Sequence, residues 1–330
     1  MTVLSSSFSL ICDICVALGG IGTLGIFIFK NMRKRIILII LYLLLAVQFL
    51  PAQTHNVTRR SGASSSMPRT STKQSPSKSS RRTKSTSSKK ETGTRNLSQS
   101  ERNRIINNLI SNMVYVEGGT FTMGATPEQC TDKYDDDAKP THQVILSSFY
   151  IGRYEVTQEE WVAVMGKNPS EYKGNKRPVE NVDWDDCQEF IRKLNTLTGK
   201  NFRLPTEAEW EFAARGGNNS RGYKYSGGND INSVAWYTNN SDWETHKVGL
   251  KQSNELGLYD MSGNVRELCS DWLGNYSSNS QTNPKGALSG YTRVNRGCGF
   301  SNLAWHCLVS TRCSYPPVYN SGDLGLRLAF

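Results

Sequence analysis

The cysteines are the residues of this sequence with the widest range of possible chemistry. Six of them fall in residues 101–330, at Cys130, Cys187, Cys269, Cys298, Cys307 and Cys313. A thiolate pair can bind a soft metal ion, two thiols can join in a disulfide, and a single buried thiol packs as a small apolar group. No two of these six form a CxxC motif, and the four histidines show no zinc-finger or HExxH spacing. The pattern therefore does not favour a zinc site, and the spacing leaves any disulfide pairing open.

Local patterns predict the elements that must position these residues. Residues 105–113 form a short amphipathic stretch, and residues 114–124 alternate like a strand interrupted by a glycine turn. Thr157 with Glu160, and Thr206 with Glu209, are capping boxes. They predict one helix over 161–165 and another over 207–215.

Between these two helices, apolar residues recur at helical spacing from Trp184 to Leu197. Cys187 lies on the same face, so we predict that it is a core thiol. Beyond Gly216 the chain is dense in Gly, Asn, Ser, Trp and Tyr, with only short strand-like pieces. Such a region holds its shape through turns and side-chain hydrogen bonds. We therefore predict one α+β domain over 101–330 with low regular secondary-structure content.

The N-terminal residues predict export. Basic residues at 33–35 precede an apolar run over 36–47, and residues 51–53 read Pro-Ala-Gln, so residues 32–53 have the features of a signal peptide. Residues 1–31 would then be an upstream extension. Alternatively, residues 8–29 form a first membrane segment, and residues 32–53 remain as a membrane anchor. Both interpretations place the domain outside the cytoplasm, in the periplasm, at the cell surface or secreted.

Residues 54–100 form a basic linker rich in Ser and Thr, which we expect to be disordered because it holds too few apolar residues to form a core. Eleven Lys and Arg face one acidic residue over 56–95. The rest of the chain, from residue 96, holds 24 basic and 27 acidic residues. Because the predicted domain is slightly acidic, we expect no nucleic-acid partner.

Seven sequence blocks, in order over nearly the whole domain, resemble those of the formylglycine-generating, or sulfatase-modifying-factor, family. They are residues 116–124, 154–158, 178–184, 202–212, 257–265, 293–297 and 324–327. The resemblance implies the family's fold, a large variant of the C-type lectin fold.

Active oxidases of this family use two cysteines, separated by four residues, to bind copper and to convert a substrate cysteine to formylglycine. Aligning residues 293–297 places Cys307 at the second cysteine and Asn302 at the first. An amide is a poor ligand for Cu(I), which prefers soft thiolates. Cys298 and Cys313 do not restore the spacing, so we expect no copper site and no oxidase activity. A different cysteine pair brought together by the loop is the alternative.

The family also binds calcium around a Gly-Asn turn. Gly263, Asn264, Val265 and Glu267 match that turn and offer hard oxygen ligands. The resemblance therefore implies a calcium site here. Arg266 departs from the family pattern and adds a positive charge beside it.

Residues between the two C-terminal blocks predict a ligand-binding surface. Lectin-fold proteins diversified by retroelement mutagenesis resemble this arrangement, with a constant scaffold and variable positions confined to the C-terminal segment. Tyrosines and small polar residues on one surface form an adaptable recognition patch. The candidate ligand-binding residues are Ser301, Asn302, Trp305, His306, Tyr315, Tyr319, Asn320 and Asp323.

Three classes of function follow. The first is an exported binding protein whose ligand is a protein or glycan at the cell surface. The second is a copper-dependent oxidase in which Cys307 is catalytic, and the third is a structural component of a cell-envelope machine. In each case the N-terminal segment, if it is not cleaved, attaches the domain to a membrane.

Overall fold

The computed structural model describes residues 97–129 and 136–330. The predicted signal peptide and membrane segments, and the predicted linker up to residue 96, lie outside these residues. The linker was predicted to end at residue 100, which is too late, because helix α3 already begins at Gln99 with Ser98 as its N-cap. Among the described residues, no helix combines the length and the apolar character that crossing a membrane requires.

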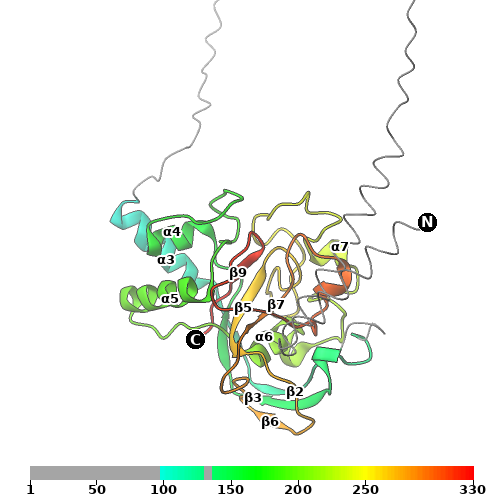
Figure 1. Cartoon of the computed structure of the whole chain (residues 1–330). Coiled ribbons are helices and arrows are strands. Elements are labelled where there is room, and N and C mark those ends of the chain that lie inside the picture. Colours follow the sequence, from blue (N-terminus) through cyan, green and yellow to red (C-terminus); the bar gives the residue numbers. More distant parts are fainter. Residues whose placement is uncertain (1–96, 130–135) are drawn as a thin grey trace, which may run out of the picture. The chain divides into compact units, whose positions relative to one another are not determined.

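Three helices pack together on one side of the domain (Figure 1). They are α3 (Gln99–Ser111), α4 (Gln158–Met165) and α5 (Trp184–Thr198). Capping boxes start α3 at Ser98 and α4 at Thr157. The box at Thr157 confirms a prediction, whereas the start of α3, six residues before the predicted amphipathic stretch, was missed.

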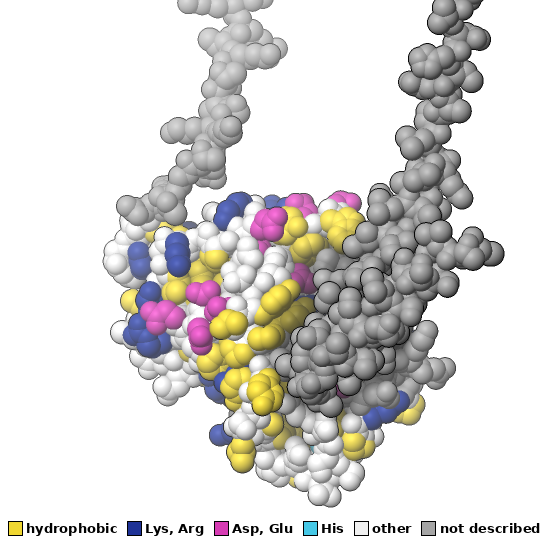
Figure 2. Space-filling model, in the orientation of Figure 1, with side chains coloured by type: hydrophobic (Ala, Val, Ile, Leu, Met, Phe, Trp, Pro, Cys, Tyr) yellow, Lys and Arg dark blue, Asp and Glu magenta, His cyan; other side chains and the backbone are white. Residues whose placement is uncertain are grey.

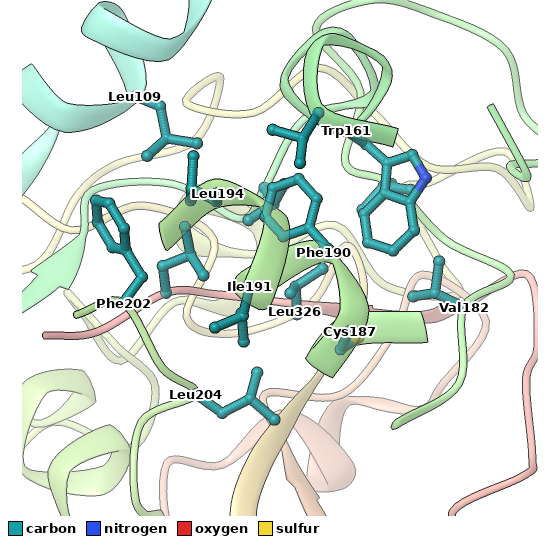
Figure 3. Packing of buried hydrophobic residues seen from close by; sticks show 14 of the residues in the cluster. Leu109, Trp161, Val182, Cys187, Phe190, Ile191, Leu194, Phe202, Leu204 and Leu326 are labelled. Carbon is teal, nitrogen blue, oxygen red and sulfur yellow. The ribbon is translucent and has the colours of Figure 1, made fainter. Parts of the chain in front are cut away.

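The face of α5 forms the centre of the largest apolar cluster (Figure 3). Trp161 of α4 stacks on Phe190 of α5, with ring centroids 4.9 Å apart. Cys187 is fully buried in this cluster, as predicted. Leu197 is half exposed, so its predicted place on the buried face was wrong; it lies in the last turn of α5, beyond the buried positions that end at Leu194.

The strands of the described residues form three small sheets. β1 (Met113–Val116) pairs with β4 (Phe149–Gly152). β3 (His142–Leu146) lies between β2 (Gly119–Met123) and β6 (Gln281–Thr282). The interrupted strand predicted over 114–124 is thus confirmed as β1 and β2, which belong to different sheets.

The largest sheet carries the C-terminal sequence blocks. Its order is β8 (Cys313–Tyr315), β7 (Arg293–Arg296), β5 (Arg266–Trp272) and β9 (Leu324–Leu326). β5 pairs antiparallel with β7 and parallel with β9. Two further helices are α6 (Glu207–Ala214) and α7 (Ile231–Val234). Helix α6 begins with the predicted capping box at Thr206. Short 3₁₀ turns lie at Asp136–Ala138, Gly217–Asn219 and Ala304–Cys307.

One buried carboxyl group predicts a pH-dependent stability. Asp271 of β5 is 2% exposed, and its Oδ2 accepts hydrogen bonds from the Glu207 amide at 3.0 Å and the Ser270 hydroxyl at 2.9 Å. Burial, and secondly the nearby Glu207, raise the pKa of Asp271 to about 7. Because the folded state holds this proton more tightly than the unfolded chain does, ionisation destabilises the fold as pH rises from about 4 to 7.

We therefore expect the change in the free energy of unfolding caused by Asp271→Asn to be about 2 kcal/mol more stabilising at pH 8 than at pH 5. Urea unfolding at both pH values measures the difference. Glu189→Gln is the control, because Glu189 is exposed and paired with Arg192, which lowers the pKa of Glu189 to about 2. An equal effect of Asp271→Asn at both pH values would show that this carboxyl does not titrate in this range.

Candidate functional site

The candidate site is the segment that leaves β7 at Arg296 and returns to the sheet at β9. It runs over residues 297–323 and contains a 3₁₀ turn, Ala304–Cys307, and the edge strand β8. In the face drawn in Figure 2, hydrophobic side chains gather over the region of β5, β7 and β9, and Asp and Glu side chains lie at its margins.

Two buried arginines anchor the ends of this segment. Arg296 forms an ion pair with Glu211 of α6, and both side chains are fully buried. Arg327 donates from Nη2 to Glu267 Oε1 at 2.7 Å and from Nε to Glu267 Oε2 at 2.9 Å. Glu267 Oε2 also accepts from Trp210 Nε1 at 2.7 Å. The C-terminal blocks thus hold the sheet and α6 together through paired internal charges.

Two of the four predicted calcium ligands, Glu267 and Asn264, also form hydrogen bonds within the protein. Both carboxylate oxygens of Glu267 are occupied by Arg327 and Trp210. Asn264 Oδ1 accepts from the His246 amide at 2.8 Å, and Asn264 Nδ2 donates to Glu155 at 2.6 Å. The side-chain oxygens of Asn264 and Glu267 thus have protein partners, and the calcium site at Gly263, Asn264, Val265 and Glu267 stays a prediction. Across residues 97–129 and 136–330, no group of three or more His, Cys, Asp or Glu side chains is placed to hold a metal ion.

Asn302, which aligns with the first cysteine of the oxidases, stabilises its loop through hydrogen bonds. Its Oδ1 accepts from the Gly299 amide at 2.9 Å, and its backbone carbonyl accepts from the Thr238 amide at 3.0 Å. The side-chain oxygen is thus used to close the turn at 299–302. This geometry does not fit a copper ligand at residue 302.

Cys307 is fully buried in an apolar cluster with Cys298, Ile231, Val234 and Tyr237. The Cys298 thiol lies near the Gly299 carbonyl and the Cys307 thiol near the Leu303 carbonyl. Sequence spacing set this pair aside, because eight residues lie between the two cysteines where the oxidase pair has four. The turn over residues 298–307 nevertheless places both cysteines in this one cluster, and the alternative of a copper-binding pair stays a prediction.

Two tyrosines form the aromatic part of the predicted binding surface. Their ring centroids, at Tyr315 and Tyr319, are 4.3 Å apart, and Tyr319 is 41% exposed. Burial raises the pKa of Tyr315 to about 12, so its hydroxyl stays protonated at neutral pH. Asn320 is exposed beside them.

Asp323 connects the two ends of the segment. Its carboxylate accepts from the Ser321 hydroxyl at 2.5 Å and from the Ser301 hydroxyl at 3.3 Å, and it lies 3.5 Å from Arg266 Nε. The structure thus brings Ser301, Tyr315, Tyr319 and Asp323 into one neighbourhood around Arg266, whose guanidinium lies 5.8 Å from the Tyr315 ring centroid. Sequence reasoning treated Arg266 only as a departure from the family pattern and missed this role.

His306 and Trp305 lie deeper than Tyr319. Both are partly buried, and their rings pack against each other. Burial, and secondly Arg266, lower the pKa of His306 to about 4, so the imidazole is neutral near pH 7. These two residues form part of the base of the surface, with limited area for a ligand to contact.

A tryptophan missed by sequence reasoning lies on a loop bound to this segment. Trp243 is 64% exposed and, like Asp242 before it, has a positive φ, of 60°. The Ser241 hydroxyl donates to the Phe300 carbonyl at 2.9 Å and accepts from the Trp243 amide at 3.2 Å. Exposed aromatic residues held by strained backbone are typical of contact sites. The sequence signal was a Trp within the polar stretch 238–246.

The fold and these blocks define a member of the formylglycine-generating-enzyme class of lectin-like folds. Residues 99–330 match the model of the sulfatase-modifying factor enzyme 1-like domain, and the chain belongs to that family.

The chain is similar in sequence to curated proteins with different names. The chain is 36% identical over 264 residues to the chaperone protein LppX of Paenibacillus barcinonensis, covering 64% of this chain and 85% of that protein. It is 28% identical over 293 residues to the formylglycine-generating enzyme of Thermomonospora curvata, covering 66% and 92%. It also matches the serine/threonine-protein kinase pkn1 of Chlamydia pneumoniae at 32% identity, but spans only 38% of that protein.

Among solved structures, the chain is similar to Treponema denticola variable protein 1. The TM-score is 0.60 and the identity 34%, covering 66% of this chain and 94% of that one. The predicted α+β fold, a formylglycine-generating variant of the C-type lectin fold with modest regular structure, is therefore confirmed.

Proposed function

We propose that this protein is exported and acts by binding a protein or glycan at the cell surface, rather than by oxidising a substrate cysteine. The observation that carries the proposal is the position of Asn302. Its side-chain oxygen is hydrogen-bonded to the Gly299 amide, at the place where the oxidases carry their first copper cysteine.

The surface offers what a binding site needs. Tyr315 and Tyr319 supply large, rigid amphipathic rings, and Asp323, Ser301 and Asn320 supply hydrogen-bonding groups around them. The ion pair of Arg266 with Asp323 and the hydrogen bond of Asn302 to Gly299 hold the segment 297–323 in place, which lowers the entropy lost on binding. Similarity to Treponema denticola variable protein 1 and to the chaperone protein LppX supports a role without catalysis.

Sequence diversification of the C-terminal segment is part of the same proposal. We infer that the positions between Gly297 and Leu324 vary between copies, while the buried arginine anchors stay constant. A reverse-transcriptase gene with an adenine-rich near-copy of this segment beside the coding sequence would support it. The absence of both would remove the diversification part and leave the binding surface itself to the next test.

The binding test uses the purified full-length protein on a glycan array and on intact bacterial cells. We expect the double variant Tyr315→Ala/Tyr319→Ala to weaken the strongest interaction at least about tenfold, because buried aromatic anchors dominate binding energy. Tyr115→Ala is the matched control, since Tyr115 is exposed on β1, in a different sheet. Unchanged binding by the double variant would place the ligand elsewhere.

The second candidate is the copper-dependent oxidase, and one observation favours it. Cys298 and Cys307 share one buried cluster, so two thiols are available although residue 302 is Asn. Copper binding would require both as thiolates. Burial raises the pKa of the Cys298 thiol, which opposes that ionisation. No step of the proposed binding role depends on copper or calcium.

A further inference from the structure

Cys298 and Cys307 differ from the other buried cysteines in having each other as neighbours. Both are at most 2% exposed, and they share one apolar cluster. Cys187 and Cys269 are buried in separate clusters that contain no second described cysteine. All five described cysteines are free thiols in this structure.

The backbone at Cys298 adds an independent observation. Its φ is 70°, in the left-handed region that favours glycine, and it lies between Gly297 and Gly299. A glycine at this position would relieve the strain. Cysteine instead adds a thiol to the buried cluster that also contains Cys307.

We propose that Cys298 and Cys307 form a disulfide that closes residues 298–307 into a loop beneath the proposed binding surface. A thiolate of one cysteine attacks the sulfur of a disulfide oxidant such as oxidised glutathione, and one molecule of reduced glutathione leaves. The second thiol, after losing its proton, attacks the mixed disulfide, forms the Cys298–Cys307 bond and releases a second molecule of reduced glutathione. Two electrons pass to the oxidant and two protons leave the protein thiols.

The folded environment determines when this reaction occurs. Burial, and secondly the neighbouring Cys307, raise the pKa of the Cys298 thiol, while Arg266 partly offsets this. Because only the thiolate is nucleophilic, the folded dithiol should react slowly. The bond therefore forms as the chain folds in an oxidising medium, before the cluster closes around both sulfurs.

The disulfide would have two consequences for the site. It would join the turn at Gly297–Gly299 to the 3₁₀ turn Ala304–Cys307, so the intervening residues, including Asn302, would be held at both ends. It would also remove Cys307 as a thiolate ligand. The inference does not rest on the proposed binding function, because it can be tested without a ligand.

Tryptic mapping tests the bond directly. Full-length protein is reduced, unfolded, refolded in a glutathione redox buffer, and alkylated without further reduction. Cleavage after Arg296 and Arg312 releases residues 297–312, which contain Cys298 and Cys307 and no other cysteine. We expect this peptide to lack alkyl groups, to be two hydrogens lighter than the dithiol, and to accept two alkyl groups after reduction.

Alkylation of both cysteines without reduction would overturn the proposal. So would a bond from either one to Cys313 or to any other cysteine.

Thermal unfolding provides a second measurement that does not depend on peptide recovery. We expect the oxidised protein to unfold about 3–8 °C above the reduced protein, because the bond restricts the unfolded chain. In Cys298→Gly, which suits the left-handed backbone, the two forms should unfold at the same temperature. Cys269→Ala should keep the difference, since Cys269 has no cysteine beside it in its cluster. Equal midpoints for oxidised and reduced wild-type protein would contradict the structural role.

Discussion

Arg327→Met is expected to destabilise the domain by about 3–5 kcal/mol, because the substitution leaves buried carboxylates without their cation. Arg327 donates to both oxygens of Glu267 and to the carbonyls of Gly152 and Tyr259, each at 2.8 Å. Burial, and then Asp260 and Glu267, raise the pKa of Glu155, and Arg327 is the cation that opposes this. The loss is measured as the free energy of unfolding in urea.

The exposed pair Arg192 and Glu189 provides the control for Arg327. Both side chains are at least 40% exposed, and the two groups lie 2.7 Å apart on α5. Because solvent screens such pairs, Arg192→Met should lower the free energy of unfolding far less than Arg327→Met does. If Arg327→Met cost no more than Arg192→Met, the charge network beneath the C-terminal segment would not contribute to stability.

Gly263→Ala is expected to cost about 3 kcal/mol or more, through strain and a backbone clash together. Gly263 has a φ of 86°, and a Cβ built there would lie 2.3 Å from the Trp236 carbonyl oxygen. That carbonyl cannot easily move, because it accepts from the Asn264 amide at 2.8 Å. The Gly-Asn turn thus has a packing role that is independent of calcium.

Gly166→Ala separates the cost of backbone strain from the cost of the clash with Trp236. Gly166 ends α4 with a φ of 78°, but a Cβ there would meet nothing within 4 Å. The cost of this control should be about 1 kcal/mol, the strain alone. Equal losses at Gly263 and Gly166, measured by the same urea unfolding, would show that the close approach to Trp236 is tolerated.

Local signals predicted much of the fold, because they act within a few residues. The capping boxes at Thr157 and Thr206 and the buried face of α5 are such signals, and all three are present. The ordered blocks then identified the lectin-like fold, which no single block could do. Leu197 was misplaced because periodicity alone does not show where the packing partners of a helix end.

The site was harder to predict, because its key contacts join residues far apart in the sequence. The family resemblance suggested Glu267 as a calcium ligand, but no local pattern pointed to its ion pair with Arg327, which lies sixty residues later, directly after β9. Cys298 and Cys307 were set aside on spacing, although the turn between them places both in one buried cluster. Trp243 reaches the segment through the Ser241 hydrogen bond, which no local pattern predicts.

The proposed binding role predicts that this member of the family does not oxidise a substrate cysteine. The direct measurement is a Cu(I) titration of the reduced full-length protein, followed by mass analysis of a Cys-x-Pro-x-Arg peptide incubated with it in air. The formylglycine-generating enzyme of Thermomonospora curvata is the positive control. We predict no tight stoichiometric copper and an unchanged peptide cysteine. One tightly bound Cu(I) per chain together with a formylglycine product would contradict the account.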